Sequence, residues 1–202
     1  MSEIESQEAN GPYFKSKIGL KALGQLLIFL ALPTLSVAEE KKFELSIYLT
    51  KKQALEIAFP GADSVDREKI WLTDEQRVAI GQITLEKIED QRITYYAGKK
   101  ADKPMGYMVI DHVIGKSFPM TFMVVLNLDG AVRNVEIMVY REPRGWEVKY
   151  KSFLSQFFGR NADSDFRDIN SITGATLSVR AMTKGVRKAV AAFKVLVLEK
   201  PP

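Results

Sequence analysis

The stretch Asp168-Ile169-Asn170-Ser171-Ile172-Thr173-Gly174-Ala175-Thr176-Leu177-Ser178 leads directly into a long amphipathic segment. After it, apolar residues recur every three or four positions, which predicts one continuous helix running to about Leu198. They are Val179, Met182, Val186, Ala189, Val190, Phe193, Leu196 and Val197. A polar loop with one glycine at a helix start combines free backbone N–H groups with the positive end of the helix dipole. Such a start suits a phosphate or another anion.

Before this stretch the sequence alternates as strands do. We expect strands over Arg92–Tyr96, Met105–Ile114, Met120–Leu128 and Val132–Tyr140. Asp129-Gly130 separates the last two and predicts a two-residue hairpin with a type I′ turn. The fold class is therefore α+β, with an antiparallel sheet of four or five strands packed against helices and the polar loop at the start of the C-terminal helix.

Two further patterns complete the predicted elements. Phe43–Leu49 alternates as a short strand, and Val148–Phe158 is an aromatic-rich helix ending at Gly159. Two capping boxes, Thr50–Gln53 and Thr73–Gln76, each open a helix; Pro60-Gly61 ends the first, and the second reaches Ile88. We expect residues 39–100 to form an N-terminal cap of the domain and residues 101–202 to form its core.

The N-terminus has the pattern of an export signal. Three lysines, Lys15, Lys17 and Lys21, precede the apolar run 22–32, and Ser36-Val37-Ala38 follows as an A-x-A-like site. We predict a signal peptide over residues 1–38 that is cleaved after Ala38, since the apolar core is shorter than the roughly 20 residues of a membrane span. An uncleaved N-terminal anchor is the alternative. The protein is then exported, to the periplasm or the outer face of the cytoplasmic membrane.

Composition excludes several kinds of chemistry. The 29 Lys and Arg are interleaved with 25 Asp and Glu, which argues against nucleic-acid binding despite the net charge of +4. The chain has no cysteine and one histidine, so thiol catalysis and cysteine-ligated metal centres are excluded and no metal site is expected. His112 is expected to have a structural or surface role. Any redox chemistry must come from an organic cofactor.

The segment Thr173-Gly174-Ala175-Thr176-Leu177-Ser178 resembles the flavin-attachment motif of the FMN-binding domain family, which occurs in subunits of the Rnf complex and of the sodium-pumping NADH:quinone reductase. The resemblance extends over about residues 105–198. It includes the Asp129-Gly130 hairpin and, in the same order, Glu142-Pro143-Arg144-Gly145, where family members often have Glu-Thr-Pro-Gly. In this loop the proline stands one place early and Arg144 occupies its usual position.

The resemblance implies a set of roles. Thr176 would carry FMN through a phosphoester bond, Thr173, Gly174 and Ala175 would approach the phosphate, and Leu177 and Ser178 would complete the site, Ser178 as a hydrogen-bond partner. The loop would contribute Glu142, Arg144, Gly145 and Trp146. Trp146, Tyr140 and Tyr107 are the aromatic side chains expected against the flavin ring, and Arg144 would compensate the charge of the reduced flavin.

A threonine hydroxyl is a weak nucleophile, so the bond needs a catalyst. The resemblance implies a separate flavin transferase that uses FAD and Mg²⁺, and redox partner proteins, some of them membrane-bound. The protein would be a stand-alone exported electron-transfer flavoprotein or a component of an extracytoplasmic reductase. Two alternatives stay open: a non-redox module that binds phosphate or another anion, and a membrane-associated subunit of a redox complex.

Overall fold

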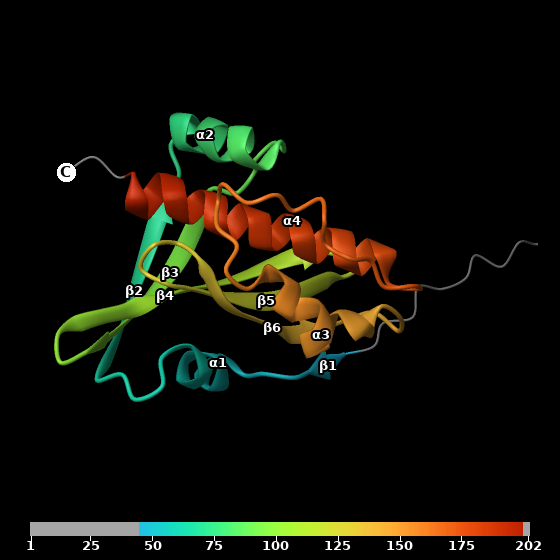
Figure 1. Ribbon diagram of the computed structural model, residues 1–202, viewed down its shortest axis with the longest axis horizontal. Helices are drawn as coiled ribbons and strands as arrows, with labels where there is room; N and C mark the ends of the chain where they lie inside the picture. Colours follow the sequence, from blue (N-terminus) through green and yellow to red (C-terminus); the bar gives the residue numbers. More distant parts are fainter. Residues whose placement is uncertain (1–44, 200–202) are drawn as a thin grey trace, which may run out of the picture. The chain divides into compact units, whose positions relative to one another are not determined.

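The computed structural model describes residues 45–199, and the predicted signal peptide lies outside them. Six strands form one antiparallel sheet in the order β1-β6-β5-β4-β3-β2 (Figure 1). Their bounds are β1 (Ser46–Ile47), β2 (Ser64–Trp71), β3 (Arg92–Lys100), β4 (Lys103–Ile114), β5 (Pro119–Leu126) and β6 (Val132–Tyr140). The predicted α+β class is confirmed, but the sheet has more strands than the four or five expected.

The strand that the sequence did not predict is β2. All eight of its residues pair with β3, from Ser64 opposite Lys99 to Trp71 opposite Arg92. It is an edge strand and is almost wholly exposed, so it lacks the apolar alternation that marks a half-buried strand. The β3–β4 hairpin spans the boundary that we expected between residues 100 and 101, so one sheet runs through both parts.

The type I′ turn was predicted at the wrong hairpin. Between β5 and β6 only Gly130 has a positive φ, of 84°, and its N–H donates to the Asn127 carbonyl at 3.1 Å. A type I′ turn needs positive φ at both central residues. That condition is met between β3 and β4, where Ala101 and Asp102 have φ of 46° and 58°. Neither is glycine, so this turn is strained.

Helices cover both faces of the sheet (Figure 1). The C-terminal helix α4 (Thr176–Phe193) and α2 (Asp74–Thr84) lie on one face, and α1 (Lys51–Ala58) lies on the other. The predicted apolar stripe of α4 is buried, and the π-helical turn η3 (Lys194–Leu198) carries the helix to the expected end. The predicted helix at 148–158 is instead three short turns: η1 (Trp146–Lys149), α3 (Lys151–Leu154) and η2 (Ser155–Phe157).

Both predicted capping boxes are present. Thr50 and Thr73 each accept a hydrogen bond from the backbone three residues on, and the glutamine at that position bonds back. The second helix is shorter than predicted, because Leu85 adopts a left-handed conformation with φ of 58° and ends α2 at Thr84.

Two apolar clusters hold these layers together. The larger lies between the sheet and α4, and the smaller lies under α1 around Met108, Met123 and Met138. α4 approaches β5 very closely at Gly185, where a Cβ atom would lie 2.5 Å from the Phe122 ring. This contact fixes α4 across the sheet, so its first turn lies at the end of β6.

Candidate functional site

The first turn of α4 begins at Thr176 without a side-chain cap. Its N-cap is Ala175, which is buried and offers no acceptor, whereas α1 and α2 have threonine caps. The first N–H groups of a helix have no acceptor within the helix. At α4 the N–H groups of Thr176, Leu177 and Ser178 are therefore available to a ligand, at the positive end of the dipole of an 18-residue helix.

The chain reaches this turn through an open loop. Gly174 has φ of 83°, and the Ala175 N–H donates to the Ile172 carbonyl at 3.0 Å. No atom lies within 4 Å of the position that a Cβ of Gly174 would take. Thr173, Gly174, Thr176 and Leu177 are exposed. The Thr176 side chain can therefore be reached from solvent, with no bulky group on the preceding residues.

Ser178 points the other way. Its side chain is buried, and its Oγ lies 2.9 Å from the Tyr140 hydroxyl. Tyr140 donates to the Arg144 carbonyl at 2.7 Å, so the serine hydroxyl is the donor to Tyr140. Burial raises the pKa of the Tyr140 phenol to about 12, which keeps this donor protonated. The Ser178 hydroxyl therefore forms its hydrogen bond with a buried side chain of the protein, Tyr140, and points away from the exposed Thr176 side chain.

The loop after β6 fits tightly against this pair. Gly145 has φ of 86°, and a Cβ there would lie 2.5 Å from Ser178 Oγ. Glu142 is buried, and its Oε1 accepts N–H bonds from Ser117 at 2.7 Å and Phe118 at 3.1 Å. These contacts bring the β4–β5 turn, the loop after β6 and the first turn of α4 together. Glu142 and Gly145 are far in sequence from Ser117, Phe118 and Ser178, so no local sequence pattern could predict these contacts.

The side chains that we expected near the flavin ring lie in different parts of the structure. Trp146 is partly exposed beside Gly145, with Lys149 Nζ 5.3 Å from its ring, and Arg144 is also exposed. Tyr140 is buried and supports the loop from beneath. The prediction for Tyr107 is wrong: its ring packs 4.9 Å from Phe193, at the far end of α4 and about 25 Å from Thr176 along the helix.

The segment before the motif is tied down at both ends. The Arg160 guanidinium makes a two-pronged ion pair with Asp168, at 2.7 and 3.0 Å, which lowers the pKa of that carboxyl. The Asn170 N–H donates to the Gln156 side chain at 2.8 Å. The loop therefore presents the motif from a fixed position, although it has no regular secondary structure.

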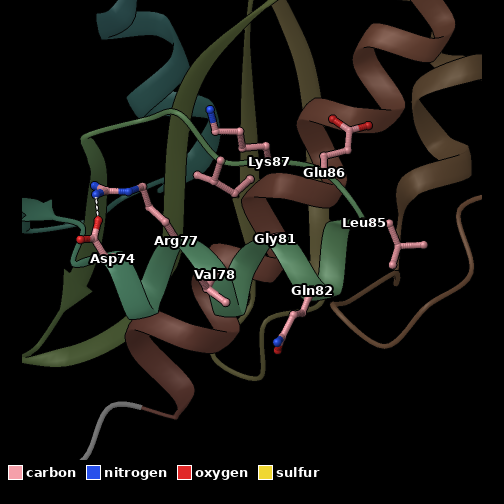
Figure 2. A pocket seen from close by; sticks show the side chains of 9 residues that line it. Asp74, Arg77, Val78, Gly81, Gln82, Leu85, Glu86 and Lys87 are labelled. Carbon is pink, nitrogen blue, oxygen red and sulfur yellow. Dashed lines mark hydrogen bonds and ion pairs between the residues drawn. The ribbon is translucent and has the colours of Figure 1, made fainter.

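Other surface features lie away from the motif. A hollow of about 570 Å³ runs along α2 and is lined by Val78, Gly81 and Leu85 (Figure 2). Among residues 45–199 there is no group of three acidic or histidine side chains that could hold a metal ion. In the same range, no helix is both long enough and apolar enough to cross a bilayer.

Comparison with known proteins links this geometry to a family. Residues 115–191 match the model of the FMN-binding domain. One relative is a component of the proton-translocating ferredoxin:NAD(+) oxidoreductase complex of Clostridium ljungdahlii. It is 31% identical over 106 residues, which are 48% of this chain and 57% of the relative. The match thus spans little more than half the length of that protein.

Two solved structures resemble the fold more distantly. NqrC of Shewanella oneidensis has a TM-score of 0.47 at 15% identity, covering 66% of this chain and 82% of that one. A component of the Na(+)-translocating NADH-quinone reductase of Parabacteroides distasonis has a TM-score of 0.45 at 12% identity, covering 67% of this chain and 78% of that one.

The matched segment contains the β5–β6 hairpin, the Glu142 loop and the first turn of α4, which the structure brings to one end of the sheet. Through residues 115–191 this chain is similar to the FMN-binding domain family.

Proposed function

We propose that this protein is an exported electron carrier that holds FMN covalently on Thr176. The observation that carries the proposal is the exposed Thr176 at an uncapped helix start, inside the segment that matches the FMN-binding domain. A phosphodiester group fits this place. It would lie among free N–H groups at the positive end of α4, and Gly174 leaves open space beside it.

The attachment step requires a second protein. In that reaction Thr176 Oγ1 bonds to the phosphorus of the FMN half of FAD, the P–O–P bridge opens and AMP leaves with the bridging oxygen. The hydroxyl proton must pass to a base. Among the described residues no histidine or carboxylate is hydrogen-bonded to Thr176, so the base belongs to a flavin transferase, which uses Mg²⁺ in this proposal.

Bound FMN supplies one- or two-electron transfer. The chain's own residues hold the attachment loop: Arg160 fixes Asp168, Tyr140 fixes Ser178 against Arg144, and Glu142 fixes the neighbouring turn. Trp146 and Arg144, exposed beside Gly145, are the side chains we expect nearest the flavin ring. A covalent link also prevents loss of the cofactor outside the cytoplasm, where the leader at residues 1–38 would send the protein.

The test is expression of the chain with a flavin transferase in a host that secretes it. After denaturation, the polypeptide should keep its yellow fluorescence and show an FMN-sized mass increment. Thr176→Ala should lose the increment, whereas Thr176→Ser and the exposed-loop control Ser171→Ala should keep it. A wild-type chain that stays unmodified under these conditions would exclude the carrier and favour an anion-binding module.

The N-terminus of the mature protein distinguishes a cleaved, exported protein from one anchored in the membrane. Sequencing of the secreted protein should begin after Ala38. A protein that keeps residues 1–38 and sediments with membranes would instead be an anchored component of a redox complex.

A further inference from the structure

One face of the sheet gathers basic side chains from strands far apart in the sequence. Residues that pair directly in an antiparallel sheet project from the same face. Arg67 pairs with Tyr96, which packs in the cluster under α1, so Arg67 and its alternate Lys69 project from the α1 face. We call the set Arg67, Lys69, Arg92, His112 and Arg141 the basic sheet face.

Arg92, His112 and Arg141 form a row across one end of the sheet, and Lys69 and Arg67 continue from that row along β2. Arg92 pairs with Trp71, and its guanidinium lies 5.5 Å from that ring. His112 pairs with Thr121, and the Arg141 Nη1 donates to the Thr121 hydroxyl at 3.1 Å. Strands are spaced about 4.8 Å apart, so the basic sheet face is on the order of 20 Å wide from β2 to β6.

Acidic side chains lie mainly on the opposite face. Glu68 pairs with Tyr95, which packs under α4, so Glu68 and its alternate Asp66 project from the α4 face, and Asp111 binds Lys188 of that helix. Of the strand carboxylates in residues 45–199, only Glu136 projects from the α1 face. It pairs with Met123, in the half that α1 covers. The uncovered half is therefore basic.

This half is also hollowed and carries exposed apolar groups. A groove of about 360 Å³ is lined by Ile110, Asp111, His112, Pro119, Thr121 and Arg141. The Trp71 side chain is 69% exposed. Arginine and tryptophan are the residues most often central to protein–protein interfaces.

The basic sheet face ends beside the attachment site. Arg141 directly follows Tyr140, whose hydroxyl lies 2.9 Å from Ser178 Oγ. Directly after the end of β4, a Cβ of Gly115 would lie 3.7 Å from the same oxygen. A protein seated on the row would thus lie next to the first turn of α4.

We propose that the basic sheet face is the docking surface for an acidic protein that exchanges electrons with the flavin. The electron-transfer part of this proposal rests on the proposed function, whereas the docking part does not. Charge complementarity identifies the partner, because the face carries four Lys and Arg side chains, whereas the one carboxylate that lines its groove, Asp111, is paired with Lys188. A membrane is the less suitable occupant, since Arg92 and Thr94 of β3 lie between Trp71 and the groove and leave no continuous apolar stripe to insert.

The docking test uses the full chain without cofactor and a fluorescein-labelled poly-L-glutamate peptide. Fluorescence anisotropy at low salt should show binding that weakens as salt is added. The variant R67E/K69E/R92E should bind at least about tenfold more weakly. R67Q/K69Q/R92Q, which removes charge without reversing it, should be intermediate. The matched control K87E/K151E/K184E changes the net charge equally at exposed sites off this face and should bind like the wild type.

Equal binding by wild type and R67E/K69E/R92E, or equal loss in the control, would overturn the proposal. So would wild-type binding to phosphatidylglycerol vesicles through these residues without binding to polyglutamate, since that result assigns the surface to a membrane.

The electron-transfer test uses the flavin-loaded protein. Its reduced form should be reoxidised faster by succinylated cytochrome c, whose lysines have become carboxylates, than by native basic cytochrome c. R67E/K69E/R92E should invert this preference, and an unchanged preference would contradict the redox role of the face. A chain that takes no flavin but binds polyglutamate through the face would refute the proposed function and leave the docking surface standing.

Discussion

The Tyr140 hydroxyl lies 2.9 Å from Ser178 Oγ and so joins the end of β6 to the first turn of α4. The two residues are 38 positions apart, and both are buried. This hydrogen bond connects the loop after β6, which holds Arg144 and Trp146, to the turn that holds Thr176. The geometry of the candidate site therefore depends on it.

Tyr140→Phe should destabilise the protein by about 1–3 kcal/mol, because the Arg144 carbonyl loses its donor and the Ser178 hydroxyl loses its acceptor. Urea unfolding of the single variants and of Tyr140→Phe/Ser178→Ala should show that Ser178→Ala costs less in the Phe background. Tyr150→Phe alters an exposed tyrosine nearby and should change little. Strict additivity would mean that the hydrogen bond contributes nothing.

Gly185→Ala should destabilise the protein although alanine is the better helix former. The helix gains about 1 kcal/mol from propensity, but the new methyl group lies 2.5 Å from the Phe122 ring, and overpacking costs about 1–3 kcal/mol. Thermal unfolding of Gly185→Ala in a Phe122→Leu background provides the control. There the substitution should be neutral or stabilising; an equal loss in both backgrounds would place its cause elsewhere.

Leu85→Gly should stabilise the protein by about 1 kcal/mol. Leu85 ends α2 with φ of 58°, a conformation that suits glycine, and its side chain is 80% exposed, so little burial is lost. The expected result is a higher Tm. Leu85→Ala keeps the unfavourable φ and should leave the Tm almost unchanged, so a rise in the alanine variant would argue against backbone strain.

Lys188→Met should cost about 3 kcal/mol at neutral pH, because Lys188 Nζ lies 3.0 Å from Asp90 and 2.9 Å from Asp111 in a largely buried site. The exposed pair of Lys184 with Glu86 offers a comparison: Lys184→Met should cost less than about 1 kcal/mol. Similar losses in the two variants would contradict a special contribution from the buried cation.

The same lysine gives a pH dependence. Burial lowers the pKa of Lys188, but the carboxylates of Asp111 and Asp90 outweigh this, and the folded pKa is raised. Its stabilisation is therefore complete below about pH 10, near the unfolded pKa, and is lost as the pH rises through the folded pKa. Urea unfolding at pH 7 and pH 11 should show the difference between wild type and Lys188→Met narrowing at pH 11. A stability difference that is larger at pH 11 than at pH 7 would contradict a raised pKa of Lys188 in the folded protein.

Short-range patterns in the sequence predicted the elements that depend on neighbouring residues. The capping boxes at Thr50 and Thr73 are formed by residues three apart, and the apolar stripe of α4 repeats every three or four residues. The polar stretch 168–178 likewise predicted a helix start close to that of α4, which begins at Thr176 inside this stretch. In each case the deciding interaction lies within one turn of the chain.

Patterns failed where a neighbour from elsewhere in the chain decides the conformation. β2 forms because β3 offers it an edge, and its charged, exposed residues show no buried face. The type I′ turn lies at Ala101-Asp102, where the register of β3 and β4 imposes it, and not at Asp129-Gly130, where composition favours it.

The sequence by itself determined that a helix follows a small, polar loop, because helix periodicity and loop composition are local properties of the chain. The structure begins that helix at Thr176, inside the stretch that the sequence assigned to the loop. Only the tertiary structure decided what surrounds that start. The packing of Gly185 on Phe122 fixes α4 against the sheet and brings Ser178 to Tyr140, while Phe193 at the other end of the helix packs against Tyr107. Such contacts depend on how the faces of α4 and the sheet fit together, which no single stretch of sequence contains.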